Sequence, residues 1–166
     1  MNDPGHGSLG DLAPMLATPW PAPFDDDEWV FELKWDGVRC IATSPGPGGL
    51  RLRSRRGNDM TSRYPELAGV ALPEGLVLDG EIVALDAGGH PSFERLQSRM
   101  NRVPGVAETP VPITYVVFDL VADGVSLLRA PLEERTGRLS SLTLPPPMVV
   151  TDRFPGRAGG VWQFVV

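Results

Sequence analysis

The chain has 166 residues, of which 42% are hydrophobic and 22% are charged, and its formal net charge is -6. This length and hydrophobic content allow one sizeable core and exclude a chain that is disordered throughout. The acidic balance argues against a surface that binds nucleic acid or membrane everywhere, so any contact with DNA must come from a local basic patch.

Cysteine use and the N-terminal residues bear on the compartment. The chain has one cysteine, Cys40, which rules out an intramolecular disulfide and fits a reducing compartment. Residues 1–7 lack a basic region followed by an apolar core, and no apolar run approaches the roughly 18 residues of a membrane span. We therefore expect a cytoplasmic protein with no membrane partner.

The front half of the chain is predicted to form strands after a loop at 21–27. Trp29 to Lys34 and Val38 to Thr43 are rich in β-formers, and Trp35-Asp36-Gly37 between them has Asp-Gly turn chemistry. We expect these two runs to be adjoining strands around a tight bend. Leu50 to Ser54 alternates leucine with arginine, which indicates a half-buried strand with a cationic outer face.

The pattern from residue 65 to residue 100 predicts two helices and a strand. Pro65 to Ala71 favours a short helix, and Leu76 to Leu85 a strand with a kink at Gly80. Ser92 is a plausible N-cap for a second helix. That helix is indicated by the apolar spacing of Phe93, Leu96 and Met100.

The last third predicts a central strand, a helix and a final strand. Val111 to Leu120 is the most apolar segment, and Asp119 near its end would be costly to bury without a partner. Pro131 to Leu142 is predicted to be a helix and Met148 to Val150 a strand. The whole pattern predicts an α+β fold, with mixed, largely antiparallel sheets and flanking helices, rather than regular βαβ alternation.

Lys34 is the only lysine, since the other fourteen of the fifteen basic residues are arginine. Arginine stays protonated, whereas a lysine that loses its proton becomes a nucleophile. Lys34 is therefore the first candidate for covalent chemistry. The alternative is that codon bias removed lysine and left one by chance.

The segment around Lys34 resembles a known motif. Lys34-Trp35-Asp36-Gly37-Val38-Arg39 is similar to the Lys-x-Asp-Gly-x-Arg nucleophile motif of the covalent nucleotidyltransferases, which are the ATP-dependent DNA ligases, RNA ligases and mRNA capping enzymes. Three further segments resemble later motifs of DNA ligases, in the family's order: Ser54-Arg55-Arg56-Gly57 with Thr61, Leu78-Asp79-Gly80-Glu81-Ile82-Val83, and Tyr115-Val116-Val117-Phe118-Asp119-Leu120. Residues 91–99 and 131–135 resemble the bacterial branch, which includes ligases of end-joining repair.

The resemblance implies an adenylation reaction with ATP and Mg²⁺. Lys34 would attack the α-phosphorus of ATP, expel pyrophosphate and carry AMP as a phosphoramidate. The attack requires a neutral amine, which nearby cations favour. Arg39, Arg55 and a Mg²⁺ ion on the phosphates are the candidate cations.

The resemblance also implies how the nucleotide is held. Arg39 and Arg55 would contact its ribose and phosphate, and Glu81 would bind the ribose hydroxyls or the metal. Phe118 would stack on adenine, and Glu32 would lie in the adenine pocket and help to select ATP over GTP. In the family, AMP then passes to a 5′-phosphate at a nick in double-stranded DNA.

Each of these residues also has a plain structural interpretation. Asp36-Gly37 could be a simple turn, Glu81 a solvated strand residue and Phe118 a core residue. The arginines could form an ordinary wet sheet face, although five of them between 51 and 63 in an acidic chain favour a strip that faces phosphates. The plain interpretation of all these residues at once is less probable than the plain interpretation of any single one.

The resemblance covers about Leu12 to Arg153 and stops before two motifs of a complete adenylation domain, Glu-Gly-x-x-x-Lys and Lys-x-Lys. We therefore expect residues 1–153 to be a partial adenylation domain with an incomplete ligase-type fold. We expect 154–166 to be a divergent C-terminal tail with no oligonucleotide-binding barrel. The function predicted is that of a DNA-ligase adenylation domain. The alternatives are an inert remnant with weak nucleotide or DNA binding, and an RNA ligase or capping-type enzyme.

Overall fold

A computed structural model describes residues 14–46, 48–101 and 111–158. The chain divides into two compact units. The first comprises Met1–Pro14 and Asp36–Val150, and the second comprises Met15–Trp35 and Thr151–Val166. Each unit is described by itself.

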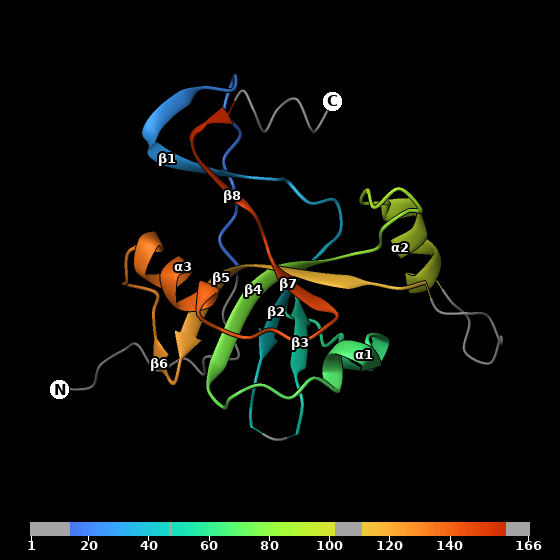
Figure 1. Cartoon of the computed structure of the whole chain (residues 1–166). Helices are drawn as coiled ribbons and strands as arrows, with labels where there is room; N and C mark the ends of the chain where they lie inside the picture. Colours follow the sequence, from blue (N-terminus) through green and yellow to red (C-terminus); the bar gives the residue numbers. More distant parts are fainter. Residues whose placement is uncertain (1–13, 47, 102–110, 159–166) are drawn as a thin grey trace. The chain divides into compact units, whose positions relative to one another are not determined.

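A mainly antiparallel sheet is the centre of the first unit. Its strands follow the order β3-β2-β4-β5-β6, and β7 pairs with β5 in parallel (Figure 1). The pairing of β2 with β3 and β4, and of β4 with β5, is antiparallel throughout. The strands are β2 (Val38–Thr43), β3 (Arg51–Ser54), β4 (Leu76–Val83), β5 (Thr114–Asp123), β6 (Val125–Ser126) and β7 (Met148–Val150).

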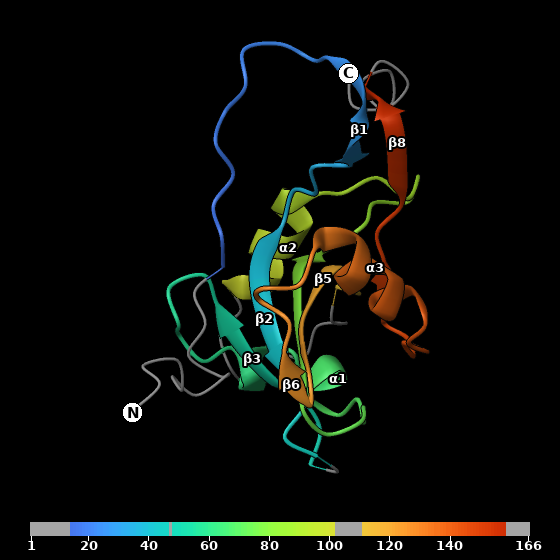
Figure 2. The same ribbon diagram turned by 90° about the vertical axis from the view of Figure 1, so that its left-hand side faces the viewer.

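The first unit also contains three short α-helices. They are α1 (Pro65–Ala68), preceded by a 3-10 turn at Thr61–Arg63, α2 (Phe93–Met100) and α3 (Leu132–Ser140). Each places one fully buried leucine, Leu67, Leu96 or Leu139, in the same core cluster. Figure 2 shows α3 beside β5, which it contacts. Within the described ranges, no helix has both the length and the apolarity to cross a membrane.

The alternation of side chains along the strands separates a core face from a second face. The core face carries Cys40 of β2, Leu78 of β4 and Tyr115 of β5, all at most 1% exposed. The Tyr115 hydroxyl donates to two backbone carbonyls, those of Cys40 and Leu78, at 2.9 and 3.1 Å. The second face is therefore the one that carries the odd-numbered residues of β2 and β4, among them Arg39, Asp79 and Glu81.

The second unit contains a two-stranded antiparallel sheet of β1 (Asp25–Glu32) and β8 (Arg153–Arg157), which lie side by side in both views (Figures 1 and 2). Phe24 packs edge-on against Trp29 and Phe31, with ring centroids 5.3 Å apart in each pair. Aromatic edges favour such contacts.

The predicted bend between β1 and β2 is wrong. β1 pairs with β8, more than 120 residues away in the sequence, and β2 pairs with β3 and β4. Gly37 is not in the left-handed region that a tight Asp-Gly hairpin needs. A Cβ on Gly37 would lie 2.2 Å from the carbonyl oxygen of Ile82, so glycine is needed there because β4 approaches closely.

The loop predicted at 21–27 is also wrong in part, because β1 already begins at Asp25. The other predicted helices and strands are present, with ends that differ by up to three residues. The strand at 76–85 has an irregular register at Gly80, where the kink was expected. Ser92 caps α2 by accepting a hydrogen bond from the Arg95 backbone N–H. Asp119 has a partner, Arg135, and Cys40 is buried. The α+β class with largely antiparallel sheets is confirmed.

Candidate functional site

Three of the predicted site residues come together on the second face of the sheet. Arg39 of β2 lies opposite Glu81 of β4 in the strand register, and Phe118 lies on β5, the next strand. The guanidinium carbon of Arg39 is 4.4 Å from the centroid of the Phe118 ring, within the range of a cation–π contact. All three side chains are half-buried.

Asp79 fixes the guanidinium of Arg39. Its carboxylate accepts hydrogen bonds from Nε at 2.6 Å and from Nη2 at 2.7 Å, and its side chain is only 9% exposed. Burial by itself lowers the pKa of Arg39, but the hydrogen bonds and charge of Asp79 outweigh it and raise that pKa. Burial also raises the pKa of Asp79, and Arg39 opposes this rise. The group thus presents a permanently charged, oriented cation.

Glu81 holds the start of the β2 segment. Its Oε1 atom accepts a hydrogen bond from the Gly37 backbone N–H at 3.2 Å. The missing side chain of Gly37 allows this contact, because a Cβ would also meet the Glu81 Cγ atom at 3.0 Å. The carboxylate that was expected to serve the ribose or a metal therefore also anchors the residue three positions after Lys34.

Lys34 and Glu32 belong to the second unit. Glu32, the last residue of β1, accepts a hydrogen bond from Arg153 at 2.8 Å. The Trp35 indole N–H donates to the Thr151 hydroxyl at 3.1 Å. Lys34 is exposed and lies between these two anchored positions, so its backbone is held on both sides within the unit.

Arg55 lies one residue beyond β3 and is exposed. In the antiparallel register Ser54 lies opposite Cys40. Arg55 is the next residue after Ser54, and Arg39 is the residue before Cys40, so the two arginines are neighbours of the same pair. Arg51 and Arg53 of β3 are also exposed, whereas Leu52 between them is fully buried. The alternation predicted for this strand is confirmed.

Two residues that matter to the site were not predicted as site residues. Asp79 was noted only as part of a motif, yet it orients Arg39. The available signal was its place two residues before Glu81 in a strand, which puts both side chains on one face. Arg135 of α3 binds Asp119, the neighbour of Phe118. Residues 131–135 were noted for their resemblance to bacterial ligases, but the pairing with Asp119 leaves no local signal in the sequence.

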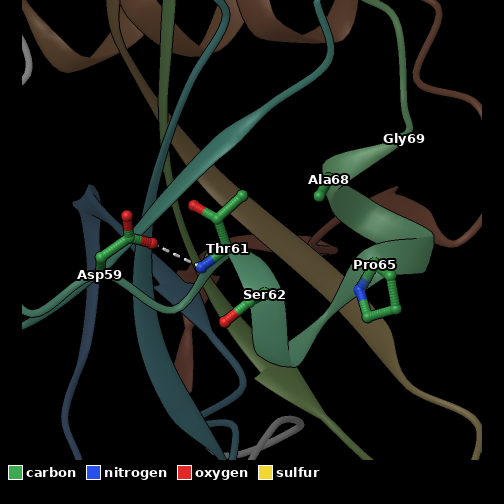
Figure 3. A pocket seen from close by; sticks show the side chains of 6 residues that line it. All are labelled: Asp59, Thr61, Ser62, Pro65, Ala68 and Gly69. Carbon is green, nitrogen blue, oxygen red and sulfur yellow. Dashed lines mark hydrogen bonds between the residues drawn. The ribbon is translucent and has the colours of Figure 1, made fainter.

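A separate hollow lies beside α1. Figure 3 shows Asp59 accepting a hydrogen bond from the Thr61 backbone N–H at 2.7 Å at its rim. The residues that line it include none of the predicted site residues. They are Asp59, Thr61, Ser62, Pro65, Ala68 and Gly69.

A family comparison decides what this site belongs to. The sequence model of the family described as "ATP dependent DNA ligase domain" matches residues 14–153. The chain belongs to this family. The match includes every residue proposed above for the site, and most of both units.

Curated proteins similar to this chain include ligases and ligase-like proteins. It is 38% identical over 139 residues to the SPbeta prophage-derived DNA ligase-like protein LigB of Bacillus subtilis, covering 83% of the chain and 50% of that relative. It is 37% identical over 161 residues to the multifunctional non-homologous end joining protein LigD of Mycolicibacterium smegmatis, covering 94% of the chain and 20% of that relative. The chain thus spans half or less of the length of these relatives.

Solved structures of ligases share the fold. The ligase domain of Mycobacterium tuberculosis LigD matches with a TM-score of 0.77 and 35% identity, covering 94% of this chain and 50% of that one. A mycobacterial DNA ligase D complexed with ATP and MES matches with a TM-score of 0.78, 35% identity and the same coverage.

Proposed function

We propose that this chain is the adenylation domain of an ATP-dependent DNA ligase and that Lys34 carries AMP as a covalent intermediate. The observation that carries the proposal is the family match over residues 14–153, which includes Lys34 together with the Arg39, Glu81 and Phe118 group. A relative solved with ATP and a curated end-joining relative support the choice of nucleotide and of DNA as the final substrate.

The proposed step is a displacement at the α-phosphorus of ATP. The neutral Nζ amine of Lys34 forms a bond to phosphorus while the bond to the oxygen that bridges to the β-phosphate breaks. Pyrophosphate leaves, and the nitrogen gives up one proton to solvent. The product is a lysine-AMP phosphoramidate, from which AMP would pass to a 5′-phosphate in nicked double-stranded DNA.

The group on the sheet would bind the nucleotide. Phe118 would stack on adenine, which would give a stack of guanidinium, ring and base with Arg39 on the other side of the ring. Arg39 donates to Asp79 through two of its five N–H groups, and we propose that remaining donors contact the ribose or phosphate. Arg55 would contact phosphate, and Glu32 would help to select the base.

Mg²⁺ would bind mainly through the phosphates of the substrate. Among the described residues, no group of three or more His, Cys, Asp or Glu side chains could hold a metal. This fits Mg²⁺, which commonly binds through one or two carboxylates and the substrate phosphates rather than in a cage of protein ligands. Glu81 is the carboxylate that we propose for it. When bound, the ion would neutralise charge on the phosphates.

The test is transfer of label from α-labelled ATP to the purified chain in the presence of Mg²⁺. Wild type should become labelled, and Lys34→Arg should not, because a guanidinium keeps the charge but is no nucleophile. A matched control is the double variant Lys34→Arg with Arg129→Lys, which restores one lysine at an exposed position. It should also stay unlabelled.

Other outcomes would assign other functions. Labelling of Lys34→Arg would exclude Lys34 as the nucleophile. Preference for GTP over ATP would favour a capping-type enzyme. Calorimetric binding of ATP without any adduct would mean that the chain binds nucleotide and does no chemistry.

A further inference from the structure

Phe118 occupies a bulge in β5. Asp79 of β4 pairs with Asp119, and the next residue, Gly80, pairs with Val117, so Phe118 is the extra residue. A Cβ on Gly80 would lie 2.4 Å from the Val116 carbonyl oxygen, so glycine allows the strands to come together here. A bulge redirects a side chain and is often found beside active sites. The direction of the Phe118 ring therefore depends on what holds this bulge.

Helix α3 holds the residue next to Phe118. Arg135 donates to both carboxylate oxygens of Asp119, from Nε at 2.8 Å and from Nη2 at 2.9 Å. Its third nitrogen, Nη1, donates to the Ala130 carbonyl oxygen at 2.7 Å. The Asp119 Oδ1 atom also accepts the Leu120 backbone N–H at 2.8 Å. Such a bidentate pair sets both the distance and the plane of the carboxylate.

The bulge is thus supported from two sides. Asp119 next to Phe118 is held by Arg135, whose side chain is 18% exposed. The ring itself contacts Arg39, which Asp79 holds. Asp79 and Asp119 lie opposite each other in the register, so two carboxylate and guanidinium pairs flank one aromatic ring.

We propose that Arg135 is a positioning residue which, through Asp119, directs the Phe118 ring toward the adenine base. The proposal rests on the proposed function, because it assigns Arg135 to the binding of the nucleotide used there. Loss of the Arg135 and Asp119 pair would let the bulge relax and would weaken stacking of Phe118 on the base. The contacts between the protein and the phosphates of ATP would stay.

The test compares Arg135→Gln with Arg138→Gln on the same helix. Arg138 is 44% exposed and pairs with Glu134 at 2.9 Å, outside the proposed site. The labelling reaction is followed as a single turnover, with KM taken as the ATP concentration that gives half the maximal rate of labelling and kcat as that maximal rate constant. Arg135→Gln should raise this KM about tenfold through weaker base stacking, with kcat nearly unchanged. Inhibition by inorganic tripolyphosphate, which has no base, should not change. Arg138→Gln should behave as wild type.

A second variant protects the test against misfolding. Arg135→Lys keeps the charge but loses the bidentate geometry, so its KM should lie between those of wild type and Arg135→Gln. An unchanged KM in both variants would overturn the proposal, and so would equal weakening of ATP and tripolyphosphate binding. A fall in kcat alone would indicate partial unfolding and would also overturn it. Absence of label on wild type would refute the proposed function itself.

Discussion

At the scale of single residues, the Arg39 and Asp79 pair shows how the sheet holds a cation where burial opposes charge. The Arg39 side chain is 27% exposed and that of Asp79 9%. Taking such charges out of water is costly, and the bidentate geometry offsets the cost only while both partners are present. The pair therefore matters more for the orientation of Arg39 than for net stability.

Removing Asp79 should destabilise the fold. Asp79→Ala leaves a partly buried guanidinium without its carboxylate, and we expect the free energy of unfolding to fall by about 2 kcal/mol. Urea denaturation measures this change. The matched control is Glu94→Ala on the exposed side of α2, which should change the free energy by less than about 0.5 kcal/mol. Equal small effects in the two variants would contradict this account of the pair.

At the scale of elements, two glycines that look alike in the sequence have opposite roles. Gly37 precedes β2 and faces the Ile82 carbonyl oxygen, at 2.2 Å from the position of a Cβ. Gly137 lies in the exposed middle of α3, where a Cβ would meet nothing within 4 Å. The first glycine permits strand packing, whereas the second only weakens a helix.

The same substitution should therefore have opposite effects at these positions. Gly37→Ala should lower the free energy of unfolding by about 2 to 3 kcal/mol, because β2 must shift away from β4. Gly137→Ala should raise it by about 0.5 to 1 kcal/mol through helix propensity. Thermal and urea denaturation of both variants measure this, and a change of the same sign in both would refute the packing role of Gly37.

The elements also show where sequence reasoning succeeds and where it stops. The strand at 50–54 and the Ser92 cap were predictable because alternation and capping are local. The pairing of β1 with β8 was not, since an Asp-Gly dipeptide indicates a turn while the true partner is more than 120 residues away.

The sequence likewise indicated some residues of the site and not others. Short motifs that resemble those of a family pointed to Arg39, Glu81 and Phe118, which the structure brings together. The face that Asp79 shares with Glu81 follows from local alternation, but its pairing with Arg39 depends on strand register. The role of Arg135 depends on a helix that packs from elsewhere. The roles of the six predicted site residues, the domain boundary at 153 and the nature of 154–166 remain predictions.

At the scale of the whole molecule, every cysteine and tyrosine side chain is buried. The chain has one cysteine and two tyrosines, and Cys40, Tyr64 and Tyr115 are at most 1% exposed. Burial raises the pKa of Cys40 to about 12 and raises the pKa values of both tyrosines. The folded state therefore keeps three protons that the unfolded chain releases at lower pH.

Stability should fall in alkali for this reason. Between pH 9 and about 12 the unfolded chain binds fewer protons than the folded chain at Cys40, so the free energy of unfolding decreases as the pH rises. The slope is about 1.4 kcal/mol per pH unit for each such group, and the tyrosines add to it above pH 10.

Urea denaturation from pH 8 to pH 11 measures this slope. The Cys40→Ala control should start less stable, and its stability should begin to fall at a higher pH than that of wild type. Tyrosinate absorbance should appear only as the structure unfolds. Free ionisation of both tyrosines in the folded chain would contradict their burial.

The central claim is that Lys34 forms a covalent bond to AMP, and the most direct measurement is the mass of the modified peptide. The chain is incubated with ATP and Mg²⁺, digested at alkaline pH to preserve the acid-labile phosphorus–nitrogen bond, and analysed by mass spectrometry. We predict one AMP on the peptide that contains Lys34 and its loss after mild acid. AMP on any other residue, or no adduct on the chain at all, would contradict the claim.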